Sequence, residues 1–477
     1  MKRTVTLSIL LIVILLPLLH VSSVLSVSIV VNKVPENIHH GGTEVPEANA
    51  NVNSQIAIDQ ALLSEINKIK AIDNHAHPLR VVSDGEIVDL EDYAGPPQSF
   101  DIPIGLRPDN RKYLLASKAL FGNAGDDMSA AALLAAKQQV IREQGDAFPT
   151  WVLDRLGIEV MLTNRVAMGR GLKPPRFLWV PFADPLMYPL DNSGMGSNPD
   201  YVARFKGAER MLATYMKDSA VQLLPATLDE YLSKVVTETI TRQKRQGAVA
   251  LKFATAYHRT LNFASVTQSD ARAVYARYRR SGVPPPSEYK ALPDFIFRHI
   301  AREAGRLGLV VHIHVGGGAS GYFNQSGANP FVLEPVLNDP TLRKTKFVLI
   351  HGGLPFAQET RLLIYKPNVY TDFSGQTFLL STRELSTVLR SWLEFVPEKI
   401  LFGTDAFEVS PPEINWADLG WVTITNAREA LALALTGMDQ RRRHHSRTCI
   451  GTGPQGDAGE CGEIVWTGHA VALTKQL

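Results

Sequence analysis

The sequence predicts an α/β fold, a (β/α)8 TIM barrel with long inserted βα loops. Eight short apolar, β-branched runs recur along the chain, and the stretches between them often have helical periodicity. Nearly continuous apolar runs are typical of strands buried on both faces of a parallel sheet. Strands of this kind that alternate with helices indicate a barrel. No internal repeat is visible, which argues against solenoids and propellers.

The predicted strands are, in chain order, Ile69–Asp73, Gly157–Thr163, Arg176–Ala183, Ala248–Ala254, Leu309–Val315, Lys346–Gly352, Asn368–Ser374 and Lys399–Asp405. The clearest predicted helix covers Leu292–Gly308, because Ile296, Ile300 and Ala304 fall on one stripe and Gly308 can end it. Two later stretches, Ser381–Val396 and Asn426–Gly437, have the same pattern.

Two of the predicted connections are unusually long. The one after the first strand contains a helical stretch, Ser129–Gly145, and the one after the third strand covers residues 184–247. Long βα loops are where barrels build their substrate pockets. We therefore expect both connections to contribute to a site at the mouth of the barrel.

The N-terminus is predicted to be separate from the fold. Residues 1–26, "MKRTVTLSILLIVILLPLLHVSSVLS", combine a basic start, an apolar run and small residues, which is typical of a secretory signal peptide. An uncleaved anchor or a buried helix is the alternative, although the run is short for a span. Residues 27–60 are predicted to be a linker, followed by a barrel over 61–438. We expect a secreted or periplasmic protein with no stable membrane span after signal cleavage.

Composition narrows the function classes. The chain has 477 residues, 45% of them hydrophobic, and six tryptophans, which indicates a folded globular protein. The net charge of +2, with no long basic block in the body, argues against nucleic-acid binding. The two cysteines, Cys449 and Cys461, cannot form a zinc ribbon, but they can pair in an exported protein.

Residues able to bind a metal cluster at the ends of the predicted strands. In "DNHAH", His75 and His77 are two residues apart, so both imidazoles can reach one point. Later strands carry further polar groups at their C-terminal ends. In a barrel the C-terminal ends of all strands face the same opening. The later groups are Lys252, His312, His314, His351 and Asp405.

We expect His75, His77, His314 and Asp405 to bind a divalent metal, because a buried ionised Asp needs a partner or a metal. His314 lies nearer the mouth than His312, which is expected to support a ligand or lie in the core. Lys252 can form a structural ion pair, bind substrate, or bridge two metals after carboxylation. His and Asp ligands suit Zn²⁺, and Mn²⁺ or Fe²⁺ fits the same ligand types.

The set of motifs resembles the amidohydrolase superfamily, in particular its amidohydrolase-related branch and the domain found fused to glutamine-synthetase-like proteins. The pieces that match are "IDNHAHP", "GAVALKFATAY", "GLVVHIHVGGG", "FVLIHGG", "NVYTDFS" and "ILFGTDAF", and they cover about residues 65–435. The resemblance implies a metal-dependent barrel hydrolase. It implies first-strand ligands His75 and His77, a fifth-strand ligand His314 and an eighth-strand ligand Asp405.

The resemblance also implies roles for two further positions. His351 matches a histidine that acts in catalysis in one-metal members and binds the second metal in two-metal members. Lys252 occupies the fourth-strand position, which is a carboxylated lysine in some two-metal relatives. Residues 439–477 depart from the family pattern, because the composition shifts to Arg, His, Gly and Cys and helical periodicity is lost. We interpret this segment as a divergent insertion or a reading-frame error.

The leading hypothesis is hydrolysis of a C–N or C–O bond in a small polar substrate. Asp405 would take a proton from a metal-activated water and pass it to the leaving group, and His351 would stabilise the oxyanion. A metal-dependent non-oxidative decarboxylase is the alternative, for which Arg80, Arg259 or Arg361 could hold a carboxylate. A non-catalytic binding barrel is a third hypothesis. The expected partner is a small-molecule substrate, and a homo-oligomer is one expectation for such a barrel.

Overall fold

The computed structural model describes residues 57–81, 101–122, 129–410 and 412–449, with side chains up to residue 439. It contains a strand at each of the eight predicted positions, and most are shorter than expected. The strands are β1 (Ala71–Ala76), β2 (Ile158–Asn164), β3 (Phe177–Val180), β4 (Ala250–Phe253), β5 (Val310–His314), β6 (Phe347–Ile350), β7 (Val369–Asp372) and β8 (Ile400–Leu401). The signal-peptide prediction lies outside the described residues, as does the linker prediction up to residue 56.

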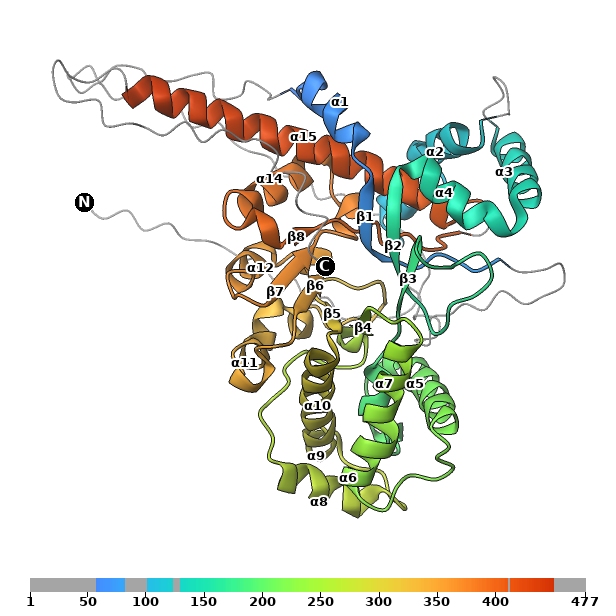
Figure 1. Cartoon of the computed structure of the whole chain (residues 1–477), viewed down its shortest axis with the longest axis vertical. Helices are drawn as coiled ribbons and strands as arrows, with labels where there is room; N and C mark the ends of the chain where they lie inside the picture. The colour runs from blue at the N-terminus through green and yellow to red at the C-terminus, as the bar shows by residue number, and fades with distance from the viewer. Residues whose placement is uncertain (1–56, 82–100, 123–128, 411, 450–477) are drawn as a thin grey trace, which may run out of the picture. The chain divides into compact units, whose positions relative to one another are not determined.

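The strands form two parallel sheets, one of β1–β2–β3 and one of β4 to β8 in chain order (Figure 1). Parallel bridges from Trp179 to Ala248 and from Phe182 to Lys252 connect the end of the first sheet to the start of the second. Parallel strands in sequential order, connected by helices, are the arrangement of a barrel-type α/β protein. The chain therefore has a TIM-barrel-like α/β fold.

Three helix ends follow directly from the local sequence. Helix α1 (Gln60–Lys68) begins where the Asp59 side chain accepts hydrogen bonds from two backbone N–H groups. Helix α10 (Ala291–Leu307) ends at Gly308, whose φ of 65° suits a residue without Cβ. Helix α14 (Thr382–Leu393) starts with a reciprocal capping box between Ser381 and Glu384. The predictions for α10 and α14 are confirmed.

The two long connections carry several helices each. The first contains η1 (Ile104–Leu106), α2 (Arg111–Phe121), α3 (Ala130–Gln144), η2 (Gly145–Ala147) and α4 (Phe148–Leu156). The second contains η3 (Asp184–Met187), η4 (Ser193–Met195), α5 (Pro199–Asp218), α6 (Leu228–Tyr231), η5 (Leu232–Thr237) and α7 (Glu238–Arg245). Figure 1 shows α2 to α4 gathered in one group and α5 to α7 in another.

Shorter helices fill the remaining connections. After β4 these are η6 (Thr255–Tyr257), α8 (Gln268–Tyr278) and α9 (Pro286–Tyr289). After β5 they are η7 (Ser326–Ala328), η8 (Pro330–Leu333), α11 (Glu334–Leu337) and η9 (Pro340–Leu342). After β6 and β7 they are η10 (His351–Gly353), α12 (Ala357–Leu363), α13 (Gln376–Leu379) and η11 (Pro397–Lys399).

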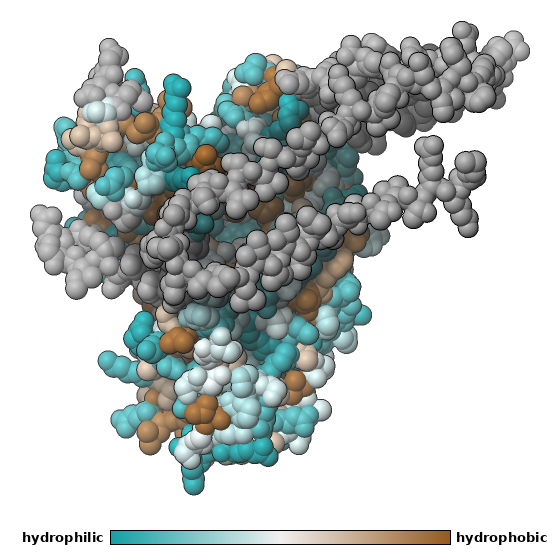
Figure 2. Space-filling view, turned by 180° about the vertical axis from the view of Figure 1, so that it is seen from behind, coloured by the Kyte–Doolittle hydropathy of each residue, from teal (hydrophilic) through white to brown (hydrophobic). Residues whose placement is uncertain are grey.

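The main hydrophobic core packs α5, α7 and α10 against the second sheet. Phe263 stacks on Phe297 of α10 with ring centroids 3.8 Å apart, and Phe253 of β4 meets the same ring edge-on at 4.9 Å. Aromatic pairs of this kind stabilise a core beyond the area they bury. On the face drawn in Figure 2, hydrophobic side chains form separate small patches among hydrophilic ones. Among the described helices, none is both long and apolar enough to cross a membrane.

The last described helix, α15 (Trp416–Cys449), extends beyond the predicted end of regular structure. Helical periodicity is lost in the sequence from about Asp439, yet the helix continues for ten residues beyond it. Gln and Arg are good helix formers, and extending an existing helix costs far less than nucleating a new one. Residues 450–477, which include Cys461, lie outside the described part of the chain.

Candidate metal centre

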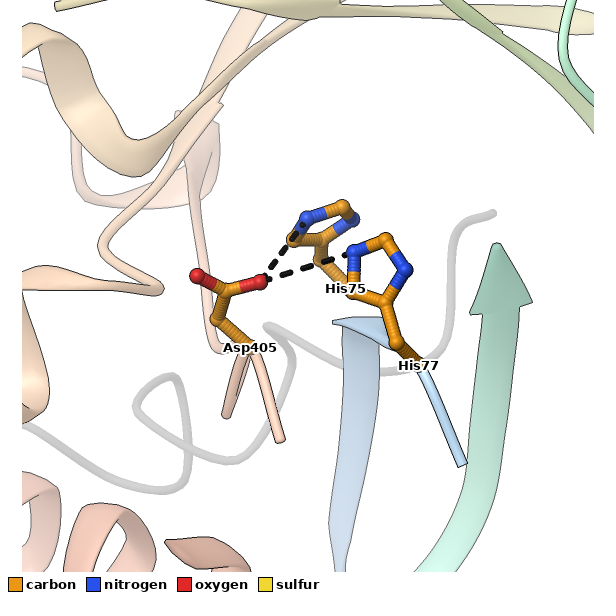
Figure 3. A group of neighbouring side chains, drawn as sticks. All are labelled: His75, His77 and Asp405. Atoms are coloured by element: carbon orange, nitrogen blue, oxygen red, sulfur yellow. Dashed lines mark ion pairs between the residues drawn. The ribbon is translucent and has the colours of Figure 1, made fainter. Parts of the chain in front are cut away.

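The end of β1 brings two imidazoles to one point. His75 is the fifth residue of β1 and His77 follows the strand, and their ring centroids are 5.0 Å apart. Asp405 reaches the same point from the segment after β8, with Oδ1 3.2 Å from Nε2 of His75 and 3.6 Å from Nε2 of His77 (Figure 3). One ligand atom from each of the three residues lies within 4.8 Å of the others. This spacing suits coordination of a single cation.

Long-range hydrogen bonds hold Thr404, the residue before Asp405, against the side chain of Asp73. The N–H of Thr404 donates to Oδ1 of Asp73 at 3.0 Å, and the Thr404 hydroxyl donates to Oδ2 at 2.5 Å. Asp405 itself has a φ of 51°, a conformation that is uncommon for a residue other than glycine. Residues held in such conformations cluster at functional sites, because the surrounding structure must impose the strain.

His351 also has an uncommon backbone conformation, with a φ of 71°, and it starts η10 directly after β6. Its backbone N–H donates to Oδ1 of the buried Asp372 at 2.8 Å. The His351 ring lies 5.0 Å from that of His75, and its Nδ1 is 3.8 Å from Oδ2 of Asp405. Both strained residues therefore meet at the candidate centre.

His314, the last residue of β5, lies beside His351, with ring centroids 4.5 Å apart. Its Nε2 is 3.1 Å from the carbonyl oxygen of Gly317, so Nε2–H donates there and Nδ1 keeps its lone pair. His314 is not part of the three-residue cluster formed by His75, His77 and Asp405. The structure thus places the predicted fifth-strand ligand next to the cluster.

Lys252 and His312 lie deeper, side by side on β4 and β5. Nζ of the buried Lys252 is 3.4 Å from Nε2 of His75, so this lysine belongs to the centre. His312 is buried, and burial together with the charge of Lys252 lowers its pKa to about 3. Its Nδ1 has no hydrogen-bond partner in the described structure. His312 lies outside the three-residue cluster.

The electrostatics of the centre suit a cation. Burial lowers the pKa of His77 to about 3 and lowers the pKa of His75, His314 and His351 well below its usual value. These imidazoles are therefore neutral, as a metal ligand must be. Burial also raises the pKa of Asp405 well above its usual value, since its ionised form lacks full compensation. A cation among these groups would provide that compensation.

Asn164, at the end of β2, supports both histidines of the pair, and sequence reasoning missed it. Its side-chain amide nitrogen is 2.7 Å from Nδ1 of His75, while its Oδ1 has no hydrogen-bond partner among the described residues. The backbone of Asn164 accepts a hydrogen bond from the His77 ring. Since Nε2 of His77 faces Asp405, the donor is Nδ1–H, and Nε2 keeps its lone pair. Turning the Asn164 amide by a half-turn would allow Nδ1–H of His75 to donate to Oδ1.

Asp372 and Ser374 form a second missed support, around His351. The Ser374 hydroxyl donates to Oδ1 of Asp372 at 2.7 Å and lies 3.0 Å from Nδ1 of His351. A hydroxyl has one hydrogen, so Nδ1–H of His351 donates to Ser374 and its Nε2 keeps the lone pair. Asn74 donates to Oδ2 of the same Asp372 at 2.9 Å. Asp372 and Ser374 both lie in the predicted seventh strand, but only the folded structure shows which side chains they contact.

The three arginines suggested as carboxylate holders all have other partners. Arg259 pairs with Asp294 at 2.6 Å and also donates to two backbone carbonyls. Arg361 donates to the carbonyl oxygen of Ser391 and lies over the Phe395 ring. Arg80 packs against Gly169, where an added Cβ would lie 2.6 Å from its Cδ.

Comparisons with known proteins agree with this fold. A structure from Lactobacillus casei, described as a metal-dependent hydrolase, is 18% identical with a TM-score of 0.54, covering 80% of this chain and 91% of that one. Uronate isomerase from Bacillus halodurans is 12% identical with a TM-score of 0.51, covering 83% and 90%. Uronate isomerase from Thermotoga maritima is 14% identical with a TM-score of 0.50, covering 84% and 97%. At these identities the likeness concerns the fold alone.

No curated protein sequence matches the chain. The family model described as amidohydrolase matches residues 72–423, which include every residue of the candidate centre and all of the strands except the first residue of β1. Members of this family are metal-dependent enzymes that act on small molecules. The extent of the match shows that this chain belongs to the amidohydrolase family.

Proposed function

We propose that the protein is a metal-dependent hydrolase that cleaves a C–N or C–O bond of a small polar substrate. The observation that carries this proposal is the meeting of His75, His77 and Asp405, with their ligand atoms within 4.8 Å. His314 would complete the ligand set with the lone pair of Nδ1. Nitrogen and carboxylate ligands favour Zn²⁺, and Mn²⁺ or Fe²⁺ remains compatible with them. The bound cation would act as a Lewis acid toward water and substrate.

The residues around the cation have distinct roles in this proposal. Asp405 takes a proton from the attacking water and passes it to the leaving group. His351 presents the lone pair of Nε2, because Nδ1–H is held by Ser374. This contact favours a proton-accepting role, or a ligand role in a two-metal site, over the oxyanion-stabilising role expected from the sequence. Lys252, once carboxylated, would be a further ligand in a two-metal centre.

The complete (β/α)8 barrel belongs to the same proposal. Backbone hydrogen bonds run from Asn74 to Phe402 at 2.8 Å and from His77 to Ala406 at 2.8 Å, between β1 and the segment after β8. These contacts, with the bridges between β3 and β4, support a closed ring of eight strands. We also propose that the chain is exported, with residues 1–26 as the signal peptide.

The test begins with elemental analysis of the purified, folded protein. About one Zn²⁺ or Mn²⁺ per chain supports the one-metal centre, and about two brings Lys252 and His351 into the ligand set. A panel of small amides, esters and lactones then tests hydrolysis, and release of CO₂ from carboxylic acids would indicate a decarboxylase instead. Asp405→Asn should lower kcat more than metal content. A folded protein that takes up no metal would refute the proposal.

A further inference from the structure

Arg204, in α5, is a buried cation whose side chain has no hydrogen-bond acceptor. The residue is 4% exposed, and its Nε is fully buried without a partner. Among the described residues, no ion pair or hydrogen bond is found for its two Nη nitrogens, which, unlike Nε, are not fully buried. Asp200, one turn earlier on α5, instead accepts the backbone N–H of Tyr322 at 2.9 Å. Burying a guanidinium without an acceptor is costly, so such a group indicates an anion that binds there.

The Arg204 guanidinium faces the candidate centre across a single aromatic ring. Its Cζ lies 4.1 Å from the centroid of the Tyr257 ring. The Tyr257 ring in turn lies 4.7 Å from the His314 ring and 5.0 Å from that of Phe323. The charge of Arg204 is among the causes that lower the pKa of His314. Tyr257 therefore contacts both the guanidinium of Arg204 and the imidazole of His314.

The loop that carries Phe323 is fixed to the start of α5. The side chain of Asn198, the N-cap of α5, donates to the carbonyl oxygen of Tyr322 at 2.8 Å. The backbone of Ala319, in the same loop, lies 3.4 Å from the Tyr257 hydroxyl. Since Arg204 stands on α5, the helix and the loop hold the guanidinium and both aromatic rings in a fixed relation. One charged group between apolar rings is the combination that lines many small-molecule binding sites.

Comparison with other buried arginines shows that Arg204 is different. Arg298, 7% exposed, pairs with Asp339 at 2.6 Å and donates to backbone carbonyls. Arg259, 6% exposed, pairs with Asp294. Each of these has a structural acceptor that compensates its burial. Arg204 has only the face of Tyr257, which attracts a cation but accepts none of the five N–H groups.

We propose that Arg204 binds a carboxylate of the substrate, with Tyr257 and Phe323 as the apolar walls beside it. Arg binds carboxylates with two parallel hydrogen bonds, which also orient the molecule. The proposal rests on the proposed function, and it narrows the substrate class to small organic acids. The scissile bond would lie a few bonds from the carboxylate, toward His314.

The test compares acids with their neutral amides. Binding of benzoate and benzamide, and of succinate and succinamide, is measured by calorimetry on the metal-loaded protein and on variants. We expect Arg204→Met to weaken binding of at least one acid by at least tenfold, with Arg204→Lys intermediate and the amides unaffected. Arg210→Met, at an exposed arginine of the same helix, is the matched control and should bind like the unaltered protein.

Several results would overturn the proposal. These are equal affinity for acids in Arg204→Met and the unaltered protein, no binding of any tested acid, or Arg204-dependent binding of inorganic phosphate in place of the acids. Thermal unfolding confirms that each variant is folded. Metal content distinguishes the carboxylate-binding role of Arg204 from the proposed function. Loss of acid binding in Arg204→Met at unchanged metal content supports the role of Arg204. A folded protein that takes up no metal refutes the proposed function, and acid binding to that protein still tests the role of Arg204.

Discussion

The backbone N–H of Asp405 donates a 2.7 Å hydrogen bond to the carbonyl oxygen of His75. This bond joins the end of the first strand to the segment after the last one. It sets the carboxylate of Asp405 beside the imidazole of His75, at 3.2 Å. The backbone contact between the two ends of the strand series thus also assembles the candidate metal centre.

Removing both histidines of the first strand should abolish metal binding. In His75→Ala/His77→Ala, two of the three clustered ligands are lost, and Asp405 and His314 are too few ligands to hold a divalent cation tightly. We expect metal content, measured by elemental analysis after dialysis, to fall by at least tenfold. His312→Ala is the control, since His312 is as buried as His75 but lies outside the cluster. Equal loss of metal in the control would contradict the assignment.

Asn164 should set the tautomer of His75. Metal binding at Nε2 requires the proton on Nδ1, and Nδ1 faces the Asn164 side chain at 2.7 Å. Asn164→Asp offers an acceptor there and should keep metal affinity, whereas Asn164→Leu should lower it about 10–100-fold. Competition with a chromophoric chelator measures both affinities. If the Asp and Leu variants weaken binding alike, Asn164 has no such role.

Ser374 should tune the basicity of His351. In Ser374→Ala the acceptor for Nδ1–H is lost, along with the link to Asp372. We expect kcat to fall about 10–100-fold on a hydrolysed substrate, with a shifted pH–rate profile and, for a one-metal centre, unchanged metal content. Ser386→Ala is the control, because Ser386 is also buried but donates to the carbonyl of Arg383. An unchanged kcat in Ser374→Ala would exclude a role of Ser374 in tuning His351.

Glu408 should make stability depend on pH. Burial, assisted by the nearby charge of Asp418, raises its pKa from 4.5 to about 7. Between these values the unfolded chain is ionised while the folded one keeps its proton, so the free energy of unfolding falls as pH rises. Glu408→Gln removes this loss, which amounts to up to about 3 kcal/mol above pH 7. Urea unfolding of both proteins at pH 4.5 and 8 measures the difference.

A matched variant tests the sign of this effect. Hydrogen bonds from Ser381 lower the pKa of the exposed Glu384 below its usual value. Its contribution to stability is therefore present above the unfolded pKa and is lost as pH falls through the lower, folded one. Glu384→Gln should cost stability at pH 8 and little in strong acid, the reverse of Glu408→Gln. The same direction for both variants would contradict the assignment.

Much of the fold could be predicted because strand signals are local. Each apolar run became a strand, since the strands of a parallel sheet are buried on both faces and therefore appear as apolar runs in the sequence. The eighth run was predicted to extend to Asp405, but β8 ends at Leu401. Beyond it the chain pairs with β1 through Phe402 and turns at Asp405. The sixth run likewise ends at Ile350, because His351 adopts a left-handed backbone conformation.

The supporting residues could not be predicted in the same way. Asn164 and Ser374 are ordinary polar residues in the sequence, and their partners come from other strands. Arg204 stands in a long connection with the polar-apolar pattern of any surface helix, yet it is buried. The arginines chosen from the sequence, such as Arg259, satisfy their charge on a structural carboxylate. Burial and pairing are properties of the assembled chain.

The sequence by itself determined the strand positions and the residues able to bind a metal at their ends, since strand periodicity and side-chain chemistry are local. It also determined the proximity of His75 and His77, which an extended backbone imposes at a spacing of two. Only the tertiary structure decided that Asp405 joins these two residues, that Asn164 supports both, and that Arg204 lacks an acceptor. Each of these depends on hydrogen bonds and burial between segments far apart in the chain, which no local pattern encodes.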